Sequence, residues 1–334
     1  MNTYKNVFVT GSIAYDTIMN FPNEFKDYFH PEKLHQINVS FVVNKLEKQL
    51  GGTGTNISYN IALISNIKDP TFVKTSADKQ RSKIFLLGSL GKDGKEFINF
   101  FKKNKIDSRG VITDKKLYTS AGSVITDIKN NQIWGFYYGA SEKIPYIDFK
   151  KLNKETDLMI ISANHKNSFL YFQREAIKYK IPYLYDPGMT LTWITDDDLK
   201  TGVMNCRYLV GNDYEIGMIL NRLKKTVNEL TSYGLNVITT LGEEGVRYQE
   251  KTVGTIHELS VHIKSFPVKK MIDPTGAGDA WRGGFVAGLL MNYLTKDCLK
   301  LGNVMASFAI EKYGTVNHRP TNKEIEKRMI KLNN

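Results

Sequence analysis

The segment 273–279, Asp-Pro-Thr-Gly-Ala-Gly-Asp, combines glycines with a carboxylate in a pattern suited to proton and phosphoryl chemistry. The apolar run at 285–290 indicates that a helix follows, so the Gly-Ala-Gly stretch would lie at a helix N-terminus. Free N–H groups and the helix dipole favour an anion there. Asp279, next to that anion, could accept a hydroxyl proton while the amides hold phosphoryl charge. The alternative is a glycine-rich turn in which Asp279 is a helix N-cap.

Two segments near the N-terminus could bind the hydroxyls of a small polar ligand. Asp16 comes just after the first predicted strand, where its carboxylate could accept hydrogen bonds from a sugar diol. Gly51, Gly52 and Asn56 lead into a predicted helix, and the Asn side chain can both donate and accept. The alternatives are a surface carboxylate in a turn and a helix cap after a flexible loop.

Two later segments place polar residues at a helix start or beside glycines. Asn212 and Glu215 are three residues apart at the start of a predicted helix, so they face one way and could order water around Mg²⁺. A capping box explains this spacing equally well. Thr240, Gly242 and Gly245 follow an apolar strand, where a β-turn closed by glycine is the simpler interpretation.

Short apolar runs alternate with helical segments along most of the chain, and this order would position the candidate residues. The predicted strands are residues 7–10, 84–87, 158–162, 183–185, 208–210 and 237–241. The predicted helices are residues 55–66, 95–105, 168–179 and 213–223. The strands are short, apolar or β-branched, and bounded by Gly, Asn or Asp. This pattern indicates a parallel sheet covered by helices on both faces.

Two stretches break that rhythm and predict a small second sheet. In residues 36–50 apolar side chains alternate with polar ones, which is typical of a strand with one wet face. A later stretch contains two β-rich arms, 123–128 and 132–138, joined at Asn130 and Asn131 as a hairpin. The two stretches could pair into a small antiparallel sheet that closes over a cleft. Its exposed edge would allow a homodimer through this lid.

Composition and charge narrow the classes of protein and partner. The 334 residues are 41% hydrophobic and 24% charged, as expected of one large globular domain with an accessory element. The net charge of +12 comes from scattered lysines, without a basic run or a nucleic-acid module, so we expect no nucleic-acid partner. Two separate cysteines, no signal segment and no long apolar stretch predict a cytoplasmic protein without a membrane partner.

Taken together and in this order, these segments resemble the ribokinase (PfkB) family. Three motifs carry the resemblance: Gly51-Gly52 with Asn56, Asn212 with Glu215, and the Gly-Ala-Gly-Asp run that ends at Asp279. Within the family the chain is most similar to bacterial and archaeal adenosine or nucleoside kinases, through residues 38–43, 136–140, 162–164, 186–188 and 312–318.

The resemblance implies a ribokinase-like three-layer α/β sandwich, in which helices cover a mostly parallel central sheet, with a small antiparallel β lid. The implied large nucleotide-binding domain comprises residues 1–16, 51–116 and 140–334, and the inserted lid comprises residues 17–50 and 117–139. The implied reaction is ATP-dependent transfer of the γ-phosphate to the 5′-hydroxyl of a nucleoside.

The resemblance also implies roles for the matching positions. The base would be Asp279, and the anion hole would be the amides of Gly276, Ala277 and Gly278. The residues implied to bind the nucleoside or sugar are Asp16, Gly51, Gly52, Asn56, Phe136, Asn164 and Met189. Those implied to bind ATP are Asn212, Glu215, Thr240, Gly242 and Gly245. Mg²⁺ would be held through water by Glu215, and K⁺ by Asp273, Thr275 and carbonyls near Gly314.

The sequence alone is compatible with three functions: a nucleoside kinase, a sugar kinase and a non-catalytic sensor. The aromatic residues of the lid favour a nucleoside, because aromatic rings can stack on a planar base. These residues are Phe41, Trp134, Phe136, Tyr137 and Tyr138. A sugar kinase acting on ribose, fructose or a related sugar is the alternative, followed by a non-catalytic nucleoside sensor. Met189 and Thr190 stand where adenosine kinases of the family have a Gln-Gln pair, and Gly122 replaces an aromatic lid residue. These departures concern the base pocket and leave the catalytic positions intact.

Overall fold

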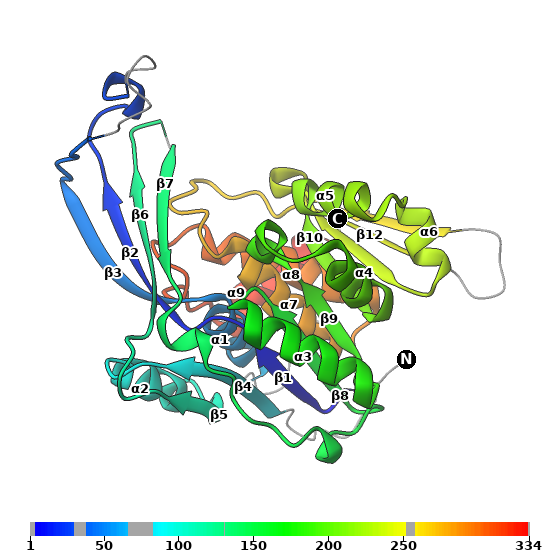
Figure 1. The fold of residues 1–334 in the computed structure, drawn as a ribbon. Helices are drawn as coiled ribbons and strands as arrows, with labels where there is room; N and C mark the ends of the chain where they lie inside the picture. The colour runs from blue at the N-terminus through cyan, green and yellow to red at the C-terminus, as the bar shows by residue number, and fades with distance from the viewer. Residues whose placement is uncertain (1–3, 30–37, 66–82, 130, 252–257, 333–334) are drawn as a thin grey trace.

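The computed structural model describes residues 4–29, 38–65, 83–129, 131–251 and 258–332, and the larger of its two sheets has nine strands (Figure 1). The strand order is β13-β12-β11-β10-β9-β8-β1-β4-β5. The bounds are β1 Asn6–Thr10, β4 Lys83–Leu90, β5 Asp107–Thr113, β8 Asp157–Ser162, β9 Tyr183–Asp186, β10 Tyr208–Asn212, β11 Asn236–Thr240, β12 Val246–Lys251 and β13 Glu258–Ile263. Pairings from β11 through β5 are parallel, and β12 and β13 pair antiparallel. This mostly parallel sheet confirms the predicted fold class, and all six predicted strands belong to it.

Helices cover both faces of the large sheet (Figure 1). One face carries α1 Thr53–Ser65, α2 Lys95–Lys103, α7 Ala277–Leu290, α8 Thr295–Ala309 and α9 Asn322–Lys331. The other carries α3 Lys166–Tyr179, α4 Asp196–Asn205, α5 Asp213–Leu223 and α6 Val227–Ser232. The four predicted helices are confirmed as α1, α2, α3 and α5. Helix α7 packs against both α1 and α8, which fixes the position of its N-terminus.

The central strands are apolar throughout because both of their faces are buried. In β1, Val7 and Val9 pack into the core beneath α1 and α7, whereas Phe8 packs into the core beneath α3. The same alternation separates Val210 from Leu209 in β10. Because both faces are covered, a ligand must approach the sheet at the ends of its strands.

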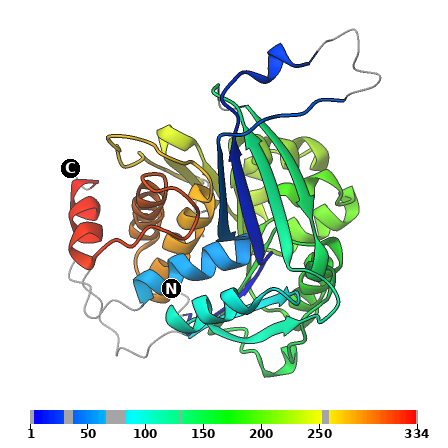
Figure 2. The ribbon, with the colours of Figure 1, turned by 90° about the vertical axis from the view of Figure 1, so that its left-hand side faces the viewer.

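The second sheet has four strands and projects from the body as a lid (Figures 1 and 2). Its order is β3-β2-β6-β7, with bounds β2 Ala14–Asn20, β3 Lys45–Gly51, β6 Ser120–Thr126 and β7 Gln132–Tyr137. The pairs β2–β3 and β6–β7 are antiparallel, and β2 runs parallel to β6. The predicted hairpin arms are confirmed as β6 and β7; of the two turn residues, Asn130 lies outside the described residues.

The predicted strand at residues 36–50 is confirmed only in its second half. Residues 36 and 37 lie outside the described residues, and residues 38–44 form no strand. Their alternation has a different cause, because Phe41 packs edge-on against Phe21 with ring centroids 4.8 Å apart and also contacts Phe25 at 5.1 Å. These aromatic contacts partly bury an apolar side chain without strand pairing, and period-two patterning cannot distinguish the two cases.

Strand β2 was not predicted, and it changes the setting of Asp16. The sequence placed Asp16 in the segment after the first strand, whereas the structure places it within β2, opposite Gln49 of β3 and Gly122 of β6. A lid strand therefore begins directly after β1, and this short connection carries the Asp16 carboxylate on the lid rather than on the body.

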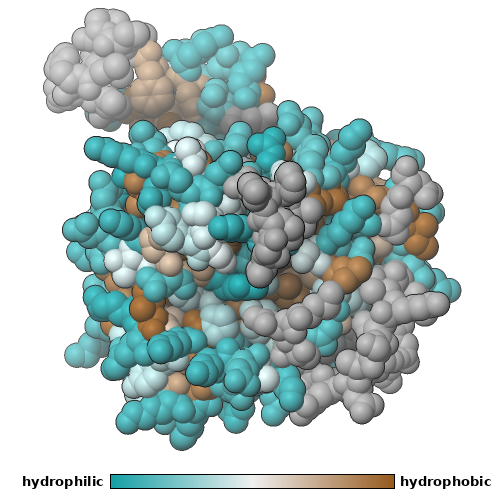
Figure 3. Space-filling view, turned by 90° about the vertical axis from the view of Figure 1, so that its right-hand side faces the viewer, coloured by the Kyte–Doolittle hydropathy of each residue, from teal (hydrophilic) through white to brown (hydrophobic). Residues whose placement is uncertain are grey.

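The surface is mostly hydrophilic on the face shown in Figure 3, where apolar residues occur in scattered spots. This distribution agrees with the lysine-rich composition and its net charge of +12. Among the described residues, no helix combines the length and the apolar character that crossing a membrane requires.

Candidate active site

The glycine-rich segment forms the N-terminus of α7, as the sequence predicted. Gly276 is the N-cap with φ 76°, a left-handed conformation, and a Cβ there would lie 2.8 Å from Thr315 Cγ2. Glycine is favoured at this position for both reasons. Asp279 lies in the first turn of α7, and no side chain caps the helix, so the alternative of Asp279 as N-cap is wrong. The Ala277 N–H donates to the Pro274 carbonyl at 3.2 Å, whereas the N–H groups of Gly276 and Gly278 have no side-chain cap and can face an anion.

Asp279 is joined to α1 by a hydrogen bond across the helix packing. Asn56 Nδ2 donates to Asp279 Oδ2 at 2.8 Å, and Thr315 Oγ1 donates to Asn56 Oδ1 at 2.8 Å. Burial raises the pKa of the Asp279 carboxyl to about 6, although Arg282 and the Asn56 hydrogen bond act to lower it. A carboxylate with a pKa of about 6 is ionised at neutral pH and is still basic enough to accept a proton.

Asp16 reaches the same region from the lid. It is 8% exposed, and a Cβ on Gly51 would lie 1.9 Å from its Oδ2, so only glycine fits beside it. Burial raises the pKa of Asp16 to about 7, with further increases from the charges of Asp279 and Asp273. The structure thus brings two carboxylates, one from the lid and one from the body, close enough to repel each other.

Phe136 lies on the same face of the lid as Asp16. A Cβ on Gly122 would lie 3.2 Å from Asp16 Oδ1 and 3.4 Å from Phe136 Cδ2, so the two side chains flank this glycine. The Phe136 ring contacts Tyr138 edge-on at 5.1 Å, and Tyr138 contacts His165 at 5.1 Å. This row of rings reaches the body next to buried Asn164, whose Oδ1 accepts from the backbone of His165.

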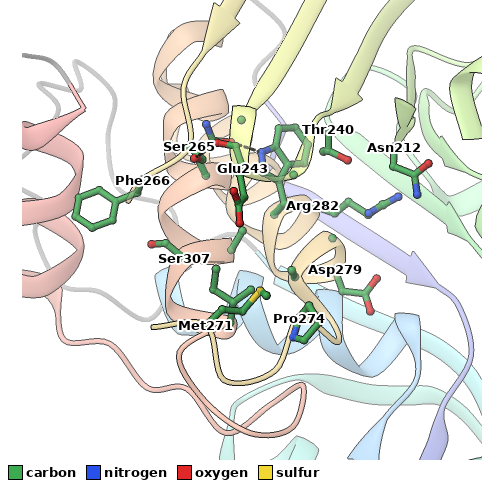
Figure 4. A pocket seen from close by; sticks show the side chains of 18 of the residues that line it. Asn212, Thr240, Glu243, Ser265, Phe266, Met271, Pro274, Asp279, Arg282 and Ser307 are labelled. Atoms are coloured by element: carbon green, nitrogen blue, oxygen red, sulfur yellow. Dashed lines mark hydrogen bonds between the residues drawn. The ribbon is translucent and has the colours of Figure 1, made fainter. Parts of the chain in front are cut away.

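A cavity of about 850 Å³ opens at the N-terminus of α7. The predicted residues that line it are Ala277, Gly278, Asp279, Met189, Asn212, Glu215, Thr240, Gly242 and Gly245. Figure 4 shows Asp279, Arg282, Asn212 and Thr240 on one side of it and Phe266, Met271 and Ser307 on the other. One end is therefore polar and the other largely apolar, an arrangement that suits a ligand with an anionic end and an apolar end.

Asn212 and Glu215 form the capping box of α5. Asn212 Oδ1 accepts from the Glu215 backbone N–H, and Glu215 Oε2 accepts from the Asn212 backbone N–H, both at 2.8 Å. Burial raises the pKa of Glu215, and the charge of Asp186 raises it further. Both residues also line the cavity, so the same two side chains cap the helix and contribute to the site.

Asp273 and Thr275 lie beside this cavity rather than among its lining residues. Asp273 is buried; one carboxylate oxygen accepts from the Thr275 backbone at 2.9 Å and the other from the Gly314 backbone at 3.0 Å. The loop at residue 314 is thereby held against the glycine-rich segment. Within the part of the chain that the structure describes, no three His, Cys, Asp or Glu residues are grouped as metal ligands.

Sequence reasoning assigned no role to two residues of the site, Arg282 and Asp186. Arg282 follows Asp279 by one helical turn, is 7% exposed, and donates from Nη2 to Asp186 Oδ1. Asp186 ends β9, and its Oδ2 accepts from Ser162 Oγ at 2.6 Å. Two sequence features could have identified them: an arginine in an otherwise apolar, glycine-rich helix, and a carboxylate at the end of a buried strand. The sequence around Phe266, which lines the apolar end of the cavity, contains no recognisable motif.

Comparison with known proteins identifies relatives over nearly the whole chain. The family model described as "pfkB family carbohydrate kinase" matches residues 8–322. A nucleoside kinase of Methanothermobacter thermautotrophicus is 26% identical over 98% of this chain and 96% of its own length. The structure of Burkholderia thailandensis nucleoside kinase in complex with inosine superposes with a TM-score of 0.80 at 24% identity, covering 97% of each chain. Methanocaldococcus jannaschii nucleoside kinase gives a TM-score of 0.79 at 23% identity, covering 99% of this chain and 100% of that one.

Proposed function

The chain belongs to the pfkB family of carbohydrate kinases, and we propose that it transfers the γ-phosphoryl group of ATP to the 5′-hydroxyl of a nucleoside. Nucleoside kinases from archaea and a bacterium are similar to it over nearly their full lengths, and one of them has been solved with inosine and with ADP and inosine. The observation that carries the proposal is the Asn56–Asp279 hydrogen bond, which joins the predicted hydroxyl-binding helix to the predicted anion site.

Asp279 acts as the general base in this reaction. Its carboxylate accepts the proton of the 5′-hydroxyl, the hydroxyl oxygen forms a bond to the γ-phosphorus, and the bond from that phosphorus to the bridging oxygen breaks. ADP leaves with the electron pair of the broken bond. The backbone amides of Gly276, Ala277 and Gly278 hold the charge that develops on the transferring group. The main contribution of the site is to align the two oxygens and stabilise charge.

The acceptor lies between the lid and α1. Asp16 and Asn56 hydrogen-bond the ribose hydroxyls, with Gly51 and Gly52 allowing close approach. The base stacks on Phe136, in the space that Gly122 leaves open beside it. Asn164 and Met189 bound the base on the side of the body. Water would compete as an acceptor in an open site, so the lid sheet formed by β2, β3, β6 and β7 closes during turnover.

ATP occupies the cavity with its phosphates toward α7 and its adenine toward the apolar wall at Phe266. Thr240, Gly242 and Gly245 line its path. Mg²⁺ would be held through water by Glu215 and would neutralise phosphate charge when bound. Glu215 lies near the Asp186 carboxylate, and a further cation besides Arg282 would suit this pair. K⁺ would be held near Asp273 and Thr275, where the buried Asp273 draws the Gly314 loop inward.

The lid also offers a surface for a second copy of the chain. Strand β7 is the edge of its sheet, and Trp134 and Tyr137 on its two faces are 47% and 48% exposed. An unpaired edge with apolar side chains favours pairing, and we propose a homodimer through it. Sedimentation velocity of the wild type should give a dimer, and Trp134→Lys should shift it to monomer.

A coupled ADP-release assay across nucleosides and sugars tests the proposed function. We expect turnover with one or more nucleosides and a much lower kcat/KM with ribose or fructose. Activity with ribose or fructose alone would contradict the nucleoside assignment and support a sugar kinase. A chain that binds nucleosides but releases no ADP with any acceptor would be a sensor.

A further inference from the structure

Arg282 places a buried guanidinium beside the N-terminus of α7. It projects from α7 one turn after Asp279, and helical side chains point back toward the helix N-terminus. A Cβ on Gly278 would lie 2.7 Å from Arg282 Nη1, so the guanidinium covers the backbone of the anion site. Arg282 is only 7% exposed, and the part that remains accessible faces the cavity (Figure 4).

The hydrogen bonds of Arg282 are incomplete in the protein alone. Nη2 donates to Asp186, but Nε is buried without a hydrogen-bond partner. A guanidinium has five N–H donors, and leaving one of them buried and unpaired is costly. A structural salt bridge would gain from satisfying them all. Arg282 also lines the cavity, and an incompletely hydrogen-bonded guanidinium there indicates a ligand with several acceptor oxygens, of which a phosphoryl group is the natural match.

Arg282 is also held in place and kept charged. Asp186 orients the guanidinium from the end of β9, and Ser162 Oγ orients Asp186 in turn at 2.6 Å. Burial acts to lower the pKa of Arg282, but Asp186, Asp279 and Glu215 together raise it above its ordinary value. A fixed cation at the N-terminus of α7 needs no reorganisation when negative charge develops nearby.

We propose that Arg282 is a catalytic residue, whose guanidinium binds the transferring phosphoryl group together with the amides of Gly276, Ala277 and Gly278, and that Asp186 and Ser162 are the residues that position it. The inference rests on the proposed phosphoryl transfer but not on the identity of the acceptor. It adds a side-chain cation to an anion site otherwise made of backbone amides. No bond to Arg282 forms or breaks, and its proton stays in place.

Steady-state kinetics of Arg282→Gln, Arg282→Lys and Asp186→Asn test the assignment with whichever acceptor supports turnover. We expect Arg282→Gln to lower kcat by about 10²- to 10³-fold, the usual effect of removing one donor to a developing oxyanion, with little change in the acceptor KM. Arg282→Lys keeps the charge and should retain part of kcat. Asp186→Asn should lower kcat less than Arg282→Gln, because the guanidinium remains.

Arg222→Gln is the matched control for a structural arginine. Arg222 pairs with Asp196 at 2.7 Å, donates to two backbone carbonyls, and lines no part of the cavity. We expect it to lower Tm with kcat within about threefold, since its contacts lie outside the site. Equal losses of kcat from Arg282→Gln and Asp186→Asn, or full activity of a folded Arg282→Gln, would overturn the proposal.

Binding of ADP with and without aluminium fluoride, measured by calorimetry, needs no turnover. Arg282→Gln should leave ADP affinity within a few-fold and should lose most of the extra affinity that aluminium fluoride confers on the wild type. If both affinities fall equally, Arg282 is structural. If the wild type turns over no acceptor but Arg282→Gln still loses the aluminium fluoride effect, the kinase proposal fails while the phosphoryl contact stands.

Discussion

The N-terminus of α7 and the outer lid strand β7 present two opposite kinds of surface to the same site. At α7, Arg282 and its partner Asp186 are buried and charged, and the sheet fixes their geometry. On β7, Trp134 and Tyr137 are about half exposed, and few neighbours hold them. Substitutions should have larger effects at the first surface, where buried charges are paired, than at the second, where the side chains face solvent.

We expect the buried charges at α7 to act in phosphoryl transfer and the exposed side chains of β7 to act in substrate selection. Charges that stabilise phosphoryl transfer must be desolvated and preorganised, which only the packed body can provide. Binding of a planar base requires a large contact area, which the side chains of an exposed strand can provide. Asp16 is the exception, because it is a lid residue that is buried and electrostatically coupled to Asp279. Changes to the buried charges of the body should therefore lower kcat, and changes to the exposed side chains of the lid should alter substrate preference.

The largest effect is expected for Asp279→Asn. Removing the base should lower kcat by about 10²- to 10⁴-fold, the usual contribution of general base catalysis. Unfolding in urea and ATP binding by calorimetry serve as controls, because the isosteric amide should leave the variant folded and able to bind ATP. A folded variant that binds ATP and keeps near-normal kcat would show that Asp279 is not the base.

The second largest effect is expected for Asp16→Asn. This variant tests whether a lid residue affects catalytic efficiency as strongly as a residue of the body. Loss of a charge-assisted hydrogen bond to a ribose hydroxyl should lower kcat/KM by about 10- to 100-fold. The effect should be much smaller for a 2′,3′-dideoxynucleoside, which lacks the hydroxyls concerned. An equal loss with both acceptors would place Asp16 outside hydroxyl binding.

The two coupled carboxylates also predict how the protein responds to pH. Asp279 must be ionised to act as a base, so kcat/KM should fall about tenfold per unit as the pH drops below about 6. Asp279→Asn should lose this limb of the profile. A wild-type rate that stays level down to pH 4.5 would contradict the assignment.

Stability should change with pH in the opposite direction. The folded pKa values of Asp16 and Asp279, about 7 and about 6, lie above the ordinary value of 3.8, so the folded state binds more protons between these limits. This contribution to stability is complete below about pH 4 and is lost as the pH rises through 7. Urea unfolding should show Asp16→Asn gaining stability relative to wild type over that range; a constant difference would mean that Asp16 is not perturbed.

A smaller effect is expected on the exposed side of the comparison. Phe136→Ala should raise the nucleoside KM by about 2- to 10-fold, as expected for loss of one aromatic stacking contact, with kcat nearly unchanged. Ile133→Ala, which is on the opposite face of β7, is the matched control and should leave KM unaltered. Equal effects of the two substitutions would indicate a general weakening of the lid.

The smallest effect concerns the capping box of α5. Asn212→Ala and Thr321→Ala each remove an equivalent cap, so each should cost about 1 kcal/mol of unfolding free energy. Only Asn212 lines the cavity, so only its variant should also raise the KM for ATP. If both leave the ATP KM unchanged, the spacing of Asn212 and Glu215 is a capping feature alone.

The sequence by itself determined the parallel strands, the covering helices and the glycine-rich N-terminus of α7. Each depends on neighbours within a few residues: apolar runs of strand length, and Gly276 at a position with positive φ before a helix. It also indicated the hairpin of β6 and β7. It did not indicate β2 or the aromatic packing of Phe41, because period-two alternation has the same appearance in a strand and in a packed loop.

Only the tertiary structure decided which of these local features meet. Asn56 and Asp279 are 223 positions apart, and Arg282 and Asp186 are 96 apart, so no spacing in the chain could pair them. The packing of α1 on α7 and the place of β9 in the sheet bring them within hydrogen-bond distance. Burial then sets their charges, because desolvation and neighbouring carboxylates act through space rather than along the chain.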